Sequence, residues 1–346
     1  MFENKTLFVV GAGASNEFGL PVGSVLAETI SKLARFDFIR HGPMRGNSTL
    51  FEQIQKKFKT DSELNEALEK FRFVSNKVQT ADSIDDFIDR FRNDELLATI
   101  GKLLISFSIL EYEGKSDLIK GIDKFGNFDI YKFENTWINK FSRTLIKGID
   151  NSRISDIGNN ISIICFNYDR CIEYYLCHYI STAYGLNFDE ALGIVNNIEI
   201  IHPYGSLGPL PESSARRNTE NVHFGLGINS YINLWDISNN IKTYTEQVND
   251  EIILDGIHHA CSGVKNVVFL GFGFHKQNLD LIGNDRKNPV QIYSSGFGIP
   301  PQQINNLSLR ILHKFYNSHN IKDLVFIESN VKCKEFFDLH CPNFSQ

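Results

Sequence analysis

The sequence has few of the residues that build a metal or redox centre. Its six cysteines are scattered and include no C-x-x-C pair, which excludes a zinc ribbon and a thioredoxin-type motif. The adjacent histidines His258 and His259 would lie on different faces of a helix, and we assign no metal to this pair. We therefore expect no bound metal and, in a reducing compartment, free thiols.

Long apolar runs and an excess of basic residues are also missing. No stretch approaches the roughly 18 uncharged apolar residues that a membrane span needs. The N-terminal segment carries Glu3 and Lys5 where a signal peptide would be apolar. The formal net charge of -6 argues against a broad nucleic-acid-binding face. We expect a cytoplasmic protein without membrane contact or direct nucleic-acid binding.

Two common catalytic loops are absent as well. The sequence has neither the G-x-S-x-G turn of α/β-hydrolases nor the G-x-x-x-x-G-K-[ST] loop of P-loop ATPases. Hydrophobic residues make up 42% of the chain and charged residues 22%, so a packed core is expected. The fold class therefore has to come from the order of strands and helices.

Short apolar runs alternate with helical patterns along the chain. Such runs, bounded by glycine or polar residues, are typical of strands buried on both faces. The alternation predicts an α/β fold: a Rossmann-like, doubly wound and mainly parallel sheet. Polar loops are expected at residues 41–48 and 209–221. The predicted strands are residues 6–10, 161–166, 198–201, 267–270, 290–293 and 324–327.

One long region interrupts this alternation. Residues 49–154 contain helical spacings, such as Ile84 to Ile88 and Trp137 to Phe141, and no strong strand pattern. We interpret this region as a helical insertion. The remaining residues, 1–48 and 155–346, would form a single nucleotide-binding domain.

The first predicted strand ends in a glycine loop. Gly11, Ala12, Gly13 and Ser15 follow it, and Gly19 comes soon after. Glycine lets the backbone turn tightly and approach a pyrophosphate, and amides at the start of the next helix can hold phosphate oxygens. The full G-x-G-x-x-G pattern is not met, so a tight turn without a ligand is the alternative.

Polar residues follow the next two strands. Asn167 and Asp169 come directly after residues 161–166, where an amide and a carboxylate can bind a carboxamide, a ribose hydroxyl or a water. The alternative is that they cap the following helix. His202 follows residues 198–201 and can act as a general base, or it is a structural histidine bonded to a loop.

The later strand ends supply three more candidates. Gly271 and Gly273 form a second loop that a ligand could approach closely, and Ser294 could hold an adenosine. The alternatives are a glycine-rich turn and a helix cap. Because ligands of doubly wound sheets bind beyond the carboxyl ends of the strands, all of these residues are expected at one edge of the sheet.

Four of these segments together resemble the sirtuin family. Residues 11–21, GAGASNEFGLP, are similar to its opening motif, and 166–169, FNYD, to its Asn-x-Asp segment. His202 with the following Gly205 resembles the catalytic His-Gly region, and residues 270–273, LGFG, a later nucleotide loop. The resemblance implies a sirtuin-type domain that binds NAD+.

The chain departs from sirtuin deacylases at three places. Residues 22–24 are Val-Gly-Ser instead of Asp-Phe-Arg, Phe166 stands where Gln is usual, and the zinc module of two C-x-x-C pairs is missing. A zinc-free sirtuin-like domain with a helical insertion resembles the sirtuin-like NADases of bacterial anti-phage defence. That group implies an NAD+-depleting effector, a homo-oligomer, and a companion defence protein (an ATPase or nuclease subunit) or a phage-derived trigger.

The resemblance also implies a role for each residue. The loop from Gly11 to Ser15 would hold the pyrophosphate, Asp169 the nicotinamide carboxamide, and Asn167 the amide or the attacking water. His202 would accept a proton as the nicotinamide–ribose bond breaks. The products would be nicotinamide and ADP-ribose, or a cyclic form. Gly271, Gly273 and Ser294 would complete the nucleotide site.

Two other functions remain open at this point. One is an NAD-dependent protein deacylase, which the missing cysteine pairs disfavour. The other is a catalytically silent nucleotide-sensing subunit. A redox dehydrogenase is a weaker option, because the acidic residue expected about 20 residues beyond the glycine loop has only Glu28 and Asp37 as loose candidates.

Overall fold

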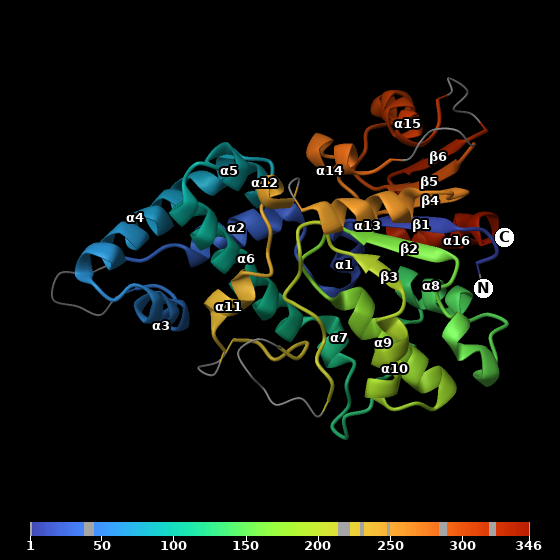
Figure 1. Cartoon of the computed structure of the whole chain (residues 1–346), viewed down its shortest axis with the longest axis horizontal. Coiled ribbons are helices and arrows are strands. Elements are labelled where there is room, and N and C mark those ends of the chain that lie inside the picture. The colour runs from blue at the N-terminus through green and yellow to red at the C-terminus, as the bar shows by residue number, and fades with distance from the viewer. Residues whose placement is uncertain are drawn as a thin grey trace.

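The computed structural model describes residues 2–37, 45–213, 222–228, 232–247, 250–283, 289–317 and 323–345. They contain a six-stranded sheet in the order β3-β2-β1-β4-β5-β6, in which all neighbouring strands are parallel (Figure 1). The predicted α/β fold is confirmed. Much of the two expected polar loops, 41–48 and 209–221, lies outside the described residues. The strands are β1 (Thr6–Val10), β2 (Ile161–Cys165), β3 (Glu199–Ile201), β4 (Asn266–Leu270), β5 (Gln291–Gly296) and β6 (Val325–Ser329).

The strand order places a reversal of direction beside β1. From β1 the chain builds β2 and β3 on one side, then returns to add β4, β5 and β6 on the other. In doubly wound sheets this reversal opens a crevice at the carboxyl ends of the two central strands, where ligands bind. Here those strands are β1 and β4.

The apolar runs became strands because helices cover both faces of the sheet. Every residue of β1, β2 and β4 is buried, whereas the edge strands β3 and β6 are half-buried. A strand buried on both faces needs apolar side chains at odd and even positions alike. This requirement explains why the central strands were the clearest in the sequence.

One face of the sheet carries the larger core. Leu7 and Val9 of β1 pack there with residues such as Ile30, Phe71 and Ile311. The helices that contribute to this face are α2 (Gly23–Leu33), α3 (Ser48–Lys57), α4 (Asp61–Lys77), α5 (Ile84–Arg90), α6 (Glu95–Lys115), α11 (Leu234–Ser238), α13 (Glu251–Cys261), α14 (Lys276–Leu281) and α15 (Pro301–Phe315).

The opposite face carries an aromatic core. Phe8 of β1 lies 5.0 Å from Phe141 and 6.4 Å from Phe337, measured between ring centroids. Successive side chains of a strand point to opposite faces, so Phe8 and its neighbours Leu7 and Val9 join different cores. The helices on this face are α1 (Ala12–Ser15), α7 (Asp117–Lys120), α8 (Trp137–Leu145), α9 (Cys171–Tyr184), α10 (Phe188–Val195) and α16 (Cys333–Phe344).

Residues 49–154 are helical, as predicted, and contribute to both cores. Helices α3 to α6 extend away from the sheet on one side (Figure 1), and α7 and α8 join the aromatic core on the other. The expected helix behind Ser83 is α5, and the Ser83 side chain accepts a hydrogen bond from the backbone amide of Asp86. The interpretation of this region as an insertion into one domain stays a prediction.

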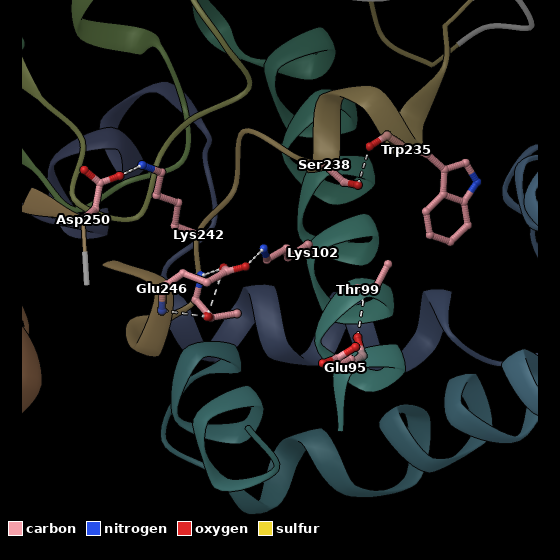
Figure 2. A network of polar contacts seen from close by, with 9 residues as sticks. Glu95, Thr99, Lys102, Trp235, Ser238, Lys242, Glu246 and Asp250 are labelled. Atoms are coloured by element: carbon pink, nitrogen blue, oxygen red, sulfur yellow. Dashed lines mark hydrogen bonds and ion pairs between the residues drawn. The ribbon is translucent and has the colours of Figure 1, made fainter. Parts of the chain in front are cut away.

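The segment after β3 fastens the helical region to the sheet. Helix α12 (Tyr244–Gln247) places Glu246 2.5 Å from the Nζ of Lys102 in α6 (Figure 2). The indole nitrogen of Trp235 in α11 donates to the backbone oxygen of Gln53 in α3 at 2.8 Å. Two parts of the sequence that are far apart are therefore held together around α6.

None of the helices in the described residues has the length and apolarity needed to cross a membrane.

Candidate functional site

A cavity of about 840 Å³ lies at the carboxyl ends of the strands. Its wall includes the loops after β1, β2 and β4, the end of β5, the residues after β6, and the start of α5 from the helical region. The cavity therefore crosses the reversal point between β1 and β4. Of the residues predicted from the sequence, it is lined by Gly11, Ala12, Gly13, Asn167, Asp169, Gly271 and Gly273.

Three glycines form the floor of the cavity by packing backbone on backbone. A Cβ on Gly271, whose φ is +56°, would lie 2.1 Å from the backbone nitrogen of Ala14. A Cβ on Gly11 would lie 2.6 Å from the carbonyl oxygen of Gly271. The Gly13 amide donates to that same oxygen at 3.0 Å. The loops after β1 and β4 therefore touch, and this contact alone requires glycine at these positions.

This packing changes the expected way of holding a pyrophosphate. The Gly11 amide donates to the Leu270 oxygen, and the Ala14 amide donates to the Gly11 oxygen, each at 2.9 Å. With the Gly13 amide also bonded, three amides of the loop are already satisfied. A phosphate could lie against the bare backbone here, but it would not be held by these three N–H groups.

Ser15 connects the first two loops without lining the cavity. Its hydroxyl donates to the Asp169 carboxylate at 3.0 Å and accepts from the Asn167 amide nitrogen at 2.9 Å. Ser15 is only 3% exposed. Ser15 therefore fixes the positions of Asn167 and Asp169, and its direct contact with a ligand stays a prediction.

The capping role considered for this pair is seen for Asp169 and not for Asn167, and the ligand-binding role of both stays a prediction. Asn167 uses its amide nitrogen on Ser15 and on the Gly11 oxygen, at 3.1 Å, which leaves the acceptor Oδ1 for a ligand. Asp169 accepts from the Cys171 amide at 3.1 Å and so also caps the start of α9. Burial raises the pKa of Asp169, although the bonds from Cys171 and Ser15 oppose this shift.

His202 lies behind Asn167 and is absent from the cavity wall. Its Nδ1 is 2.8 Å from the Asn167 backbone oxygen, and its Nε2 is 2.8 Å from a carboxylate oxygen of Glu173. A carbonyl oxygen can only accept, so Nδ1 carries a proton. Burial lowers the pKa of His202, but the Glu173 carboxylate outweighs this effect and raises it above the ordinary value.

This environment bears on the role of His202 as a base, which stays a prediction. With Glu173 ionised, both ring nitrogens donate, and a ring in that state has no lone pair to accept a proton. The histidine is nevertheless close to the site, because one hydrogen bond joins it to the backbone of Asn167. Glu173, two residues into α9, was not identified from the sequence because nothing in the pattern pairs it with His202.

Ser294 is also absent from the cavity wall. It is fully buried in β5, and the next residue, Ser295, lines the cavity instead. The Ser295 hydroxyl accepts from the Gly271 amide at 3.0 Å. Adjacent strand residues point to opposite faces, so Ser295 and not Ser294 faces the cavity, and the role of Ser294 in holding an adenosine stays a prediction.

A buried ion pair supports the loop that carries these residues. Arg170 bonds Glu113 of α6 through Nη2 at 2.7 Å and Nε at 3.2 Å, and its backbone amide also donates to Glu113 at 3.1 Å. Its Nη1 donates to the Val222 oxygen at 2.6 Å. The two side chains are 1% and 0% exposed. The helical region therefore fixes the residue next to Asp169.

Comparison of the chain with protein-family models, with curated proteins and with solved structures gives no match. Within the described residues, no group of three or more histidine, cysteine or acidic side chains is arranged to hold a metal ion. The chemistry of the site must therefore be argued from the cavity itself. It offers an amide, several carboxylates and a glycine floor at a position where doubly wound sheets bind nucleotides.

Proposed function

We propose that the cavity binds NAD+ and that the protein hydrolyses its nicotinamide–ribose bond. The observation that carries this proposal is a single cavity that runs across the reversal point between β1 and β4, over a floor of glycine backbone. Neighbouring strands are about 4.8 Å apart, so the distance from β2 to β5 is about 14 Å. That length and a volume of about 840 Å³ suit an extended dinucleotide.

The two ends of the cavity differ in a way that suits the two ends of NAD+. At the end of β2, the Asp169 carboxylate can bind the carboxamide NH2, and the Asn167 amide oxygen can accept a hydrogen bond from a water. Beyond β5 and β6, Phe297 and Lys332 line the wall, with the Lys332 Nζ 5.1 Å from the ring centroid. An exposed aromatic ring beside a cation suits a purine base and a phosphate.

Cleavage requires the bond between C1′ and the pyridinium nitrogen to break. Its electron pair goes to the nitrogen, nicotinamide leaves as a neutral molecule, and C1′ becomes oxocarbenium-like, as in other glycoside hydrolyses. Asn167 would hold the water that attacks C1′. In this proposal His202 positions Asn167 through the backbone oxygen and takes no proton.

The test is to incubate the purified protein with NAD+ and measure nicotinamide and ADP-ribose by chromatography. We expect turnover, and we expect Asn167→Ala to reduce its rate by about 100-fold or more, the usual effect of removing one preorganised polar group. Asn196→Ala, at an exposed position after α10, is the matched control. The incubation is repeated with an acyl-lysine peptide, the second substrate that a protein deacylase would need. NAD+ that stays intact with and without this peptide would refute the proposal.

One observation favours a second candidate, a nucleotide-sensing subunit without turnover. Both nitrogens of His202 are engaged, so the histidine that the resemblance makes the base is not free. Calorimetry separates the two functions: a sensor binds NAD+ or ADP-ribose without releasing nicotinamide.

The expected role in anti-phage defence, the homo-oligomer and the companion protein belong to this proposal and rest on the sirtuin-like resemblance. The same chromatographic assay, run with and without the protein encoded beside this chain, tests the partner. Light scattering during size-exclusion chromatography tests the oligomer.

A further inference from the structure

The proposed hydrolysis needs a group that accepts a proton from the attacking water. His202 cannot do this while both its nitrogens donate. His275 lines the cavity, but it is exposed. The acceptor is therefore sought among the carboxylates of the cavity wall.

Five carboxylates line the cavity, and four of them are poorly suited. Glu17 accepts the backbone amides of two helix starts, at 3.1 and 3.0 Å. Asp169 accepts from a serine hydroxyl and a backbone amide. Asp82 is exposed, and Asp86 forms an ion pair with an arginine at 3.0 Å. The fifth is Asp85.

Asp85 lines the cavity and is joined by a hydrogen bond to the segment after β2. The Tyr168 hydroxyl donates to its Oδ1, and Tyr168 lies between Asn167 and Asp169 in the chain. This contact leaves Oδ2 of Asp85 free of the tyrosine. Asp85 comes from α5, in the helical region, so two parts of the chain that are far apart converge on one wall.

The surroundings of Asp85 favour a proton acceptor. Burial raises its pKa, which the bond from Tyr168 and the charge of His275 partly oppose. Burial also raises the pKa of Tyr168 well above its ordinary value, so the phenol stays a donor. A carboxylate that binds a proton more tightly than usual is a better base near neutral pH.

We infer that Asp85 is the general base of the site, an inference that rests on the proposed hydrolysis of NAD+. The water oxygen forms a bond to C1′ while the bond from C1′ to the nicotinamide nitrogen breaks. The electron pair of the broken bond neutralises the pyridinium ring. The proton of the water passes to Oδ2 of Asp85 and then to solvent, so atoms and charges balance.

The test compares Asp85→Asn with Asp89→Asn in nicotinamide release and in NAD+ binding measured by calorimetry. Asp89 is one turn further along α5, does not line the cavity, and accepts from Gln277 of α14 at 3.2 Å. It is the matched control for the same chemical change on the same helix (Figure 1). We expect Asp85→Asn to lower kcat by about 100- to 10,000-fold with the Kd for NAD+ unchanged, and Asp89→Asn to keep the unaltered kcat.

Three results would overturn this inference. Asp85→Asn with the unaltered rate would show that the carboxylate takes no proton. An equal loss of rate in both variants would show that Asp85 only helps to hold α5 in place. Intact NAD+ in the presence of the unaltered protein would refute the proposed function itself, and the role of Asp85 with it. A second variant, Tyr168→Phe, keeps the ring and should lower kcat less than Asp85→Asn does.

Discussion

Replacing Glu113 by glutamine should destabilise the protein strongly. The substitution keeps the size of the side chain but removes the negative charge that faces Arg170, whose side chain is 1% exposed. The guanidinium would then lie in the interior without the carboxylate that it bonds directly. Removing one partner of such a buried pair typically costs about 3–5 kcal/mol of folding free energy.

The free energy lost on replacing Glu113 is not the net contribution of the Glu113–Arg170 pair to folding. Burial raises the pKa of Glu113 even though the Arg170 guanidinium opposes the shift, which means that desolvation consumes much of the attraction. A variant that removes both charges, Glu113→Leu with Arg170→Met, should therefore recover much of the loss, because it leaves no unpaired charge behind; the Arg170 amide and the Val222 oxygen lose their partners and account for the remainder.

Urea unfolding followed by the fluorescence of the two tryptophans measures both effects. For Glu113→Gln we expect the midpoint to fall by roughly 1–2 M, the shift that about 3–5 kcal/mol produces at ordinary urea dependence. The double variant should unfold nearer to the midpoint of the unaltered protein than Glu113→Gln does. A loss below about 1 kcal/mol for Glu113→Gln, the value of an exposed pair, would refute the argument.

Three further predictions concern packing and pH. Gly271→Ala should lower the free energy of unfolding by about 1–3 kcal/mol or more through overpacking, because the new Cβ would lie 2.1 Å from a backbone atom. The control Gly263→Ala also has a positive φ, but its Cβ would meet nothing within 4 Å. Thermal unfolding should show the larger loss for Gly271→Ala. Phe141→Ala, at a site 1% exposed, should cost about 3–5 kcal/mol by the same measurement, and an unchanged melting temperature would contradict the assigned aromatic core. The pKa of His202 is raised in the folded protein, so the stability that His202 contributes is complete below pH 6.5 and is lost as pH rises through the folded pKa. The charge of His202 lowers the pKa of Glu173 although burial opposes this shift. The stability that Glu173 contributes is therefore complete above pH 4.5 and is lost as pH falls through its folded pKa. The unaltered protein should therefore melt at a higher temperature than Glu173→Gln mainly at pH values between the folded pKa values of Glu173 and His202. A difference in melting temperature that does not change with pH would contradict the ion pair.

The sequence by itself determined the strands and their common edge. Continuous apolar runs survive only where a strand is covered on both faces, so β1, β2 and β4 could be located from residue types alone. Parallel strands share one carboxyl edge, so residue order alone predicts that Gly11, Asn167 and Gly271 lie near each other. These inferences needed only the order of residues along the chain.

The tertiary structure decided which side chains face the cavity and in which state. The choice between Ser294 and Ser295 depends on the face to which each strand position points. Whether His202 can accept a proton depends on Glu173, a partner 29 positions away. Asp85 joins the site through a hydrogen bond to Tyr168, 83 positions along the chain. Sequence periodicity reports which face of an element is buried, but pairing and protonation arise from contacts between elements, which only the folded chain defines.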